Sequence, residues 1–111
     1  MKFEQIKEES PEGFGRLTGI KRTTFDVMIT ILNEADAELK AQGGKPNKLS
    51  IADRLLMALE YMREYKTYFH ISRSYGLSES ACYRTIRWVE DTLIKDGQFS
   101  LPGRKALVKR R

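Results

Sequence analysis

The chain has little of what disulfide and metal chemistry require. Its 111 residues include one cysteine, Cys82, and one histidine, His70. A lone cysteine cannot form an intramolecular disulfide or a cysteine-based metal cluster, and one histidine leaves a histidine-based zinc site short of ligands. We therefore expect no metal site and no cofactor. We interpret Cys82 as an inert, buried core residue and His70 as a packing or backbone-bonding residue.

Long apolar runs and strand patterns are also missing. No stretch approaches the roughly 18 to 20 apolar residues of a membrane span, and MKFEQIKEES lacks the apolar stretch of a signal peptide. These absences predict a cytoplasmic protein with no membrane partner. Apolar and polar residues alternate for only a few positions at a time, so no sheet is expected. With 41% hydrophobic and 32% charged residues, the composition is typical of one folded domain.

Basic charge is concentrated toward the C-terminus. Residues 1–66 hold eleven basic and eleven acidic side chains, whereas residues 67–111 hold nine basic and four acidic ones. This asymmetry indicates a polyanionic partner, although a basic tail kept for solubility accounts for the charge equally well. We expect residues 1–98 to form the folded domain. Residues 99–111 are expected to form a basic arm along DNA or a plain linker.

Helix signals recur along the first two thirds of the chain. Ser10 before Pro11 is typical of a helix start, and that short helix runs to Gly19. Ser50 can cap a later helix, with Asp53 placed for a capping box. Between them, apolar residues at spacings of three and four predict a long helix with one buried face: Phe25, Met28, Leu32, Ala35 and Leu39. The sequence predicts an all-α bundle of about five helices.

Residues 68–95 have the pattern of a helix-turn-helix. Gly76 can end the first helix in a left-handed conformation, Leu77 follows as an apolar plug, and Ser78 can cap the second helix. Ser72 is a small residue that permits close approach of the two helices. The second helix carries an inward stripe at spacings of four, three and four: Cys82, Ile86, Val89 and Leu93.

The other face of that second helix carries groups suited to DNA. Arginine can bridge the O6 and N7 acceptors of guanine, and hydroxyl groups can bond to phosphates or base edges. A charged exposed face is the plainer interpretation, but the turn pattern, the face and the charge asymmetry agree. The candidate DNA-binding residues are Arg73, Ser78, Ser80, Tyr83, Arg84, Arg87, Arg104 and Lys105.

Several other features have two interpretations. An echo of the hairpin surrounds Gly19, but acidic residues such as Asp26 favour a scaffold or dimer contact there over a second DNA contact. Trp88 lies at about 240° from Cys82, on the border between the two faces. Most of the aromatic residues from 61 to 75 are expected between helices. Four carboxylates are interpreted as helix-surface charges: Asp53, Glu60, Glu90 and Asp91.

The stretch REYKTYFHISRSYGLSESACYRTIRWVEDTLI, followed by FSLPGRK, resembles the N-terminal helix-turn-helix region of bacterial insertion-sequence transposases of the DDE superfamily. The similarity is strongest over residues 55–103. The resemblance implies binding of double-stranded DNA at terminal inverted repeats during DNA transposition. It also implies that a separate RNase H-like domain, with three acidic residues and two metal ions, cuts the strands.

No β/α pattern able to hold such a two-metal site occurs in this sequence, so we expect no catalytic residues and no enzyme activity. The partners implied are the DNA repeats, a second copy of the chain at paired ends, and a C-terminal catalytic domain or second reading frame. Two alternatives stay open at this point. One is a free-standing transcriptional regulator with a similar hairpin, and the other is an all-α interaction module whose basic tail is incidental.

Overall fold

The structure is a computed structural model that describes residues 2–43, 49–64 and 67–97. Every regular element in these ranges is a helix, which confirms the all-α prediction. The described ranges hold six helices where about five were expected, because a four-residue helix precedes Ser10. The helices are α1 (Phe3–Ile6), α2 (Pro11–Thr18), α3 (Arg22–Ala41), α4 (Ile51–Glu64), α5 (Tyr68–Tyr75) and α6 (Glu79–Asp96). The expected arm, with Arg104 and Lys105, lies outside the described residues.

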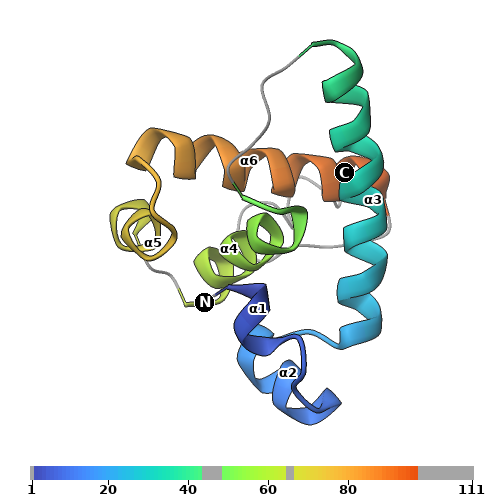
Figure 1. Ribbon diagram of the computed structural model, residues 1–111, viewed down its shortest axis with the longest axis vertical. Coiled ribbons are helices and arrows are strands. Elements are labelled where there is room, and N and C mark those ends of the chain that lie inside the picture. The colour runs from blue at the N-terminus through green and yellow to red at the C-terminus, as the bar shows by residue number, and fades with distance from the viewer. Residues whose placement is uncertain (1, 44–48, 65–66, 98–111) are drawn as a thin grey trace.

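Helix α4 is the centre of the molecule. It packs against α1, α2, α3, α5 and α6, and these helices surround it in Figure 1. Each of the seven consecutive residues 54–60 is buried, as expected of a helix that has neighbours on all sides. The five surrounding helices therefore present their outer faces to solvent.

Side-chain caps fix where the helices begin. The hydroxyl oxygens of Ser10, Ser50 and Ser78 accept hydrogen bonds from backbone amides three residues later, at 3.1 Å in each case. Such caps satisfy amides that have no partner inside the helix. The capping box predicted for Ser50 and Asp53 is half right. The Ser50 hydroxyl accepts from the Asp53 amide as predicted. The Asp53 carboxylate instead accepts from the Phe3 amide at 2.7 Å and so ties α1 to α4.

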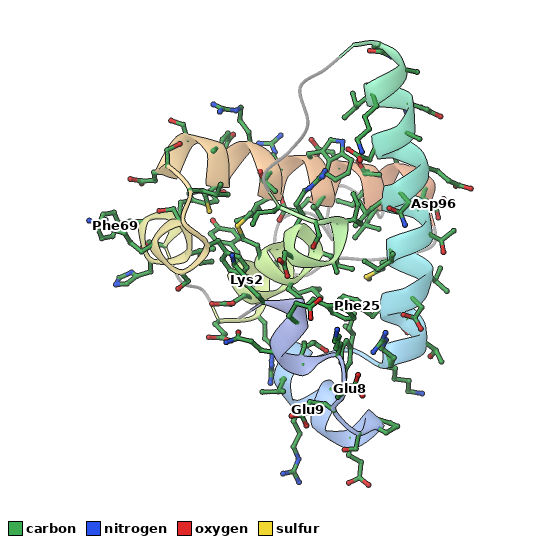
Figure 2. The ribbon with its side chains drawn as sticks, in the orientation of Figure 1. Lys2, Glu8, Glu9, Phe25, Phe69 and Asp96 are labelled. Carbon is green, nitrogen blue, oxygen red and sulfur yellow. The ribbon has the colours of Figure 1, made fainter. Side chains whose placement is uncertain are left out.

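The core combines the predicted stripes of α3 and α6. All four stripe residues of α6, from Cys82 to Leu93, are fully buried. On α3, Phe25 and Leu32 are buried, and Figure 2 places Phe25 between α3 and the N-terminal helices. The stripe continues in sequence to Leu39, but that side chain is 46% exposed. Helix α3 is therefore longer than the core that covers it.

Two carboxylates predicted at the surface are buried instead. Glu60 and Glu90 are only 7% and 5% exposed. The Tyr75 hydroxyl donates to Glu60 Oε1 at 3.3 Å, and burial together with this carboxylate raises the pKa of Tyr75 above its ordinary range. Asp91 is exposed, as predicted, and Asp53 is half-buried. The surface prediction for Glu60 and Glu90 was wrong because tyrosines from α5 lie over this side of α4 and α6.

Candidate DNA interface

Helices α5 and α6 form the predicted hairpin. Gly76 ends α5 with φ of 69°, in the left-handed region that favours glycine. The Leu77 amide then donates to the Ser72 carbonyl at 3.0 Å, and α6 begins at Glu79. Ser72 is 3% exposed, which confirms its role as the small residue where the helices meet. The turn therefore orients α6 with its stripe inward and its opposite face outward.

That opposite face, which we call the reading face, consists of Ser80, Tyr83, Arg84 and Arg87. Ser80, Tyr83 and Arg84 are exposed, and Tyr83 is 42% exposed. A shallow hollow of about 570 Å³ lies along its N-terminal part, lined by Tyr68, Glu79, Ser80, Tyr83 and Arg84. Within the described residues Arg84 makes no hydrogen bond or ion pair, so its five N–H donors are available to a ligand.

The second arginine of the reading face is held by its neighbours. Arg87 Nη1 donates to the Tyr83 hydroxyl at 3.1 Å, and Nη2 lies 3.8 Å from Asp91 Oδ2. The guanidinium carbon is 5.8 Å from the centre of the Tyr83 ring. Arg87 Nε is buried and finds no hydrogen-bond partner among the described residues. The two arginines therefore differ: Arg84 is free to reorient, whereas Arg87 lies along the helix.

The Tyr83 ring packs against aromatic rings of the neighbouring helices. Its ring meets Tyr68 edge to face at 5.3 Å, and Tyr68 stacks on Tyr61 at 4.5 Å with an angle of 7°. Burial and the neighbouring Tyr61 raise the pKa of Tyr68 above its ordinary range. This ladder, which runs from α4 through α5 to α6, fixes the Tyr83 side chain on the reading face.

Helix α5 contributes a second exposed group. The Arg73 guanidinium lies 5.1 Å from the ring centre of Phe69, which is 49% exposed and points away from the bundle at its edge (Figure 2). Among the described aromatics of residues 61–75, Phe69 is thus the exception to the expectation of a place between helices, and Tyr65 lies outside the described residues. His70 is exposed: its ring meets that of Phe69 edge to face at 6.0 Å, and its Nδ1 lies 2.9 Å from the Thr67 hydroxyl that caps α5.

Trp88 belongs to the inner side of α6. Its ring lies 5.4 Å from the Arg54 guanidinium, which is 5% exposed. Arg54 also donates to the Leu49 carbonyl at 3.0 Å and to Asp36 at 3.2 Å. The sequence singled out neither Arg54 nor Asp36, since an arginine among apolar helix residues carries no local sign that it is buried. Trp88 is therefore not part of the reading face.

A groove lies on this side of α6, next to the reading face. It has a volume of about 480 Å³, and we call it the α3–α6 groove. It is lined by Asp36, Leu39, Lys40, Gln42, Gly43, Arg54, Ala81, Arg84, Thr85 and Trp88. Arg84 lines both this groove and the hollow of the reading face, so it stands on the ridge between them.

The charge asymmetry does not arise from the hairpin itself. Residues 67–97 hold four basic and four acidic side chains, and the five remaining basic residues stand at positions 104–111. The excess basic charge therefore stands at positions 104–111, outside the described residues, and not on the reading face. The hairpin has no net charge, but its charges are separated along α6. The two arginines of the reading face stand in the first half of this helix, and Asp91 follows them.

The echo around Gly19 has the backbone geometry of the hairpin but not its chemistry. Gly19 ends α2 with φ of 84°, and α3 begins three residues later, as α6 does after Gly76. Arg22 lies over the rings of Phe3 and Phe14, 5.2 Å and 5.3 Å from their centres, and its Nε pairs with Asp26 at 3.0 Å. The α3 positions that correspond to the reading face hold Thr23, Asp26, Val27 and Thr30. This surface has no free arginine to match Arg84.

The part of the chain that the structure describes holds neither a metal cluster nor a membrane span. Within residues 2–43, 49–64 and 67–97, no three His, Cys, Asp or Glu side chains lie close enough to hold a metal ion. No helix in these ranges is long and apolar enough to cross a membrane.

Residues 47–99 match the family described as the helix-turn-helix of DDE superfamily endonuclease. This segment, with α4, α5 and α6, is therefore a helix-turn-helix domain of that family. The chain is also 44% identical over 109 residues to the probable transposase for insertion sequence element IS702 of Microchaete diplosiphon. The alignment covers 98% of this chain but only 39% of that relative. No solved structure matches the chain.

Proposed function

We propose that this chain binds double-stranded DNA sequence-specifically, with the first half of α6 in the major groove. The observation that carries the proposal is the division of α6 into two faces. One face is a fully buried stripe, and the other exposes Tyr83 and a free Arg84 directly after a capped, glycine-ended turn. A helix held in this way can enter the major groove without disturbing the core.

The side chains of the interface have different roles in this proposal. Arg84 reads a base, because a free guanidinium can form the bidentate pair with guanine. Arg87 and Tyr83 hold each other and contact the adjacent phosphate. Phosphates are bonded by Ser80, Arg73 and Ser78. Ser78 donates its hydroxyl proton, because its oxygen already accepts from the Ala81 amide. Arg104 and Lys105 follow the backbone as part of the arm.

We infer further that the DNA is the terminal inverted repeat of an insertion element and that this chain recognises it without cutting it. The relative is named as a transposase, and this chain corresponds to 39% of its length. Strand cleavage would belong to a catalytic domain or a second product outside the matched region. Because an element has two ends, a homodimer fits two-ended recognition.

The test begins with in vitro selection of a duplex from a random library, followed by gel shifts of variants. Arg84→Ala should weaken binding to the selected duplex by roughly 1 to 3 kcal/mol and relax specificity at one base pair. The matched control is Arg16→Ala on the exposed face of α2, which should leave binding unchanged. An equal loss on random DNA would reduce Arg84 to a phosphate contact, and failure to select any duplex would refute DNA recognition.

Binding that does not change with salt concentration would favour an interaction module with an incidental basic tail, because phosphate contacts release counterions. The position of the gene provides a second check. Inverted repeats flanking the gene and bound by the chain would support the transposase role over that of a transcriptional regulator.

A further inference from the structure

The C-terminal end of α3 projects beyond the core beside α6. Helix α3 has 20 residues, about 30 Å of helix, and Figure 1 shows it crossing α6 with its last turns extending past it. Residues 37–43 are all exposed, and Leu39 continues the apolar stripe of α3 with no core to cover it. The α3–α6 groove occupies the angle between this free end and the first half of α6.

The groove is lined by charged and apolar side chains together. Lys40, whose side chain is 62% exposed, stands on the α3 edge, and Arg84 stands on the α6 edge. The apolar part of the lining includes the Trp88 ring and Leu39. Asp36 is the one carboxylate of the lining, and it is paired with Arg54 at 3.2 Å and with Lys40 at 3.4 Å. The lining therefore carries three cations against one carboxylate.

Two acidic residues near the C-terminal end of α3 lie on the side away from the groove. With Asp36 at 0°, Leu39 and Lys40 fall within about 60° of it, whereas Glu34 and Glu38 lie at about 160° and 200°. Helix α3 thus presents Lys40 and the paired Asp36 to the groove. The carboxylates of Glu34 and Glu38 point away from it. This arrangement suits an anionic occupant in the groove.

We propose that the α3–α6 groove holds a sugar–phosphate strand of the duplex whose major groove receives α6. This inference deepens and rests on the proposed function. Arg84 borders both the groove and the reading-face hollow, so the strand next to the base that it reads passes directly over the groove. Lys40 contacts a phosphate, and the Trp88 and Leu39 side chains pack against deoxyribose. The free end of α3 then sets the register of α6 on the DNA, as phosphate contacts do.

The test uses Lys40→Ala and a matched control, Lys21→Ala, on the selected duplex. Lys21 is an exposed lysine just before the opposite end of α3, away from the groove. One lost phosphate contact lowers the slope of log K against log salt by about 0.9. For Lys40→Ala, the drop in affinity between 50 and 200 mM salt should therefore be about 3.5-fold smaller than for the original chain. Lys21→Ala should keep the original slope, and unfolding midpoints would confirm that both variants are folded.

Trp88, the one tryptophan of the chain, provides an independent readout. Acrylamide should quench its fluorescence less in the complex with the selected duplex than in the free chain, because the strand covers the groove. Equal salt slopes for both lysine variants, with Trp88 quenched equally in free and bound chain, would overturn the inference while DNA recognition stands. Protection of Trp88 that rises with chain concentration alone would assign the groove to a second copy. If no duplex is selected at all, the proposed function itself fails.

Discussion

The single cysteine shows how burial alone changes the chemistry of a residue. Cys82 lies fully buried in the inward stripe of α6, with its sulfur 3.9 Å from that of Met57. Desolvation, with a smaller contribution from Glu79, raises the pKa of the thiol from 9.0 to about 11. Because the thiolate is the reactive form, this environment fits the prediction of an inert residue.

The raised pKa of Cys82 predicts a loss of stability in alkaline solution. The folded chain holds the thiol proton more tightly than the unfolded chain, so this contribution is complete below pH 9 and is lost as the pH rises toward 11. The Cys82→Ala variant should therefore lose less stability than the original chain between pH 8 and pH 11. Urea unfolding at several pH values measures the stability of the original chain and of the variant. The same dependence of stability on pH in both would contradict the prediction. The small cavity left by the substitution lowers stability equally at every pH.

Single residues also mark where sequence reasoning fails. The angles around a helix predict which residues share a face, and the buried stripe of α6 follows them. Helix angles do not show which other helices cover the remaining faces. The sequence therefore predicted exposure for Glu60 and Glu90, which tyrosines of α5 bury. Burial of such carboxylates requires partners that are distant in sequence, and Tyr75 lies 15 residues from Glu60.

Among the elements, the two-residue turn after Gly76 allows a direct test of backbone conformation. Gly76 has φ of 69°, and an added Cβ would meet nothing within 4 Å, so Gly76→Ala should destabilise through backbone strain alone, by about 1 to 2 kcal/mol. Gly15 lies inside α2 with ordinary dihedrals, and its nearest neighbour to an added Cβ is the Ile20 carbonyl at 3.9 Å. Gly15→Ala should therefore stabilise by about 0.4 to 1 kcal/mol. Thermal unfolding of both variants gives the comparison, and shifts of the same sign would refute this account.

The elements were more predictable than their surroundings because caps and turns are local. Ser10, Ser78, Gly19 and Gly76 act on backbone groups within a few residues, and each begins or ends a helix where the sequence indicated. The end of the core along α3 depends instead on which helices reach that far. The repeated spacing to Leu39 therefore predicted burial for a side chain that is 46% exposed.

In the whole molecule, α4 determines which surfaces are left for binding. Both glycine-turn hairpins pack on α4, and α3 crosses α6, so the free end of α3 and the outer face of α6 meet at one angle (Figure 1). No single helix defines the proposed DNA surface. This surface depends on the relative positions of α3, α4 and α6, which the periodicity of the sequence does not specify.

Arg54 holds these three helices together. From α4 it reaches Asp36 on α3 at 3.2 Å and the Trp88 ring on α6 at 5.4 Å. Arg54→Ala would leave the half-buried Asp36 with only Lys40 as its partner, and breaking a buried pair costs about 3 to 5 kcal/mol. The loss of stability should fall at the lower end of this range, because the Asp36 side chain is 15% exposed. Urea unfolding measures the loss, and Trp88 emission should shift to longer wavelength in the folded variant as the ring gains water.

The control for Arg54 lies on the same helix. Arg63 donates to the Leu17 carbonyl at 2.9 Å across an exposed contact between α4 and α2. Its replacement by alanine should cost no more than about 1 kcal/mol, since the freed carbonyl can bond to water. If the Arg54 and Arg63 variants lost the same stability, the contacts of Arg54 would contribute no more than one exposed hydrogen bond. A large loss for Arg54→Ala alone, with a shifted Trp88 emission, would establish it as the residue that fixes α3 beside α6.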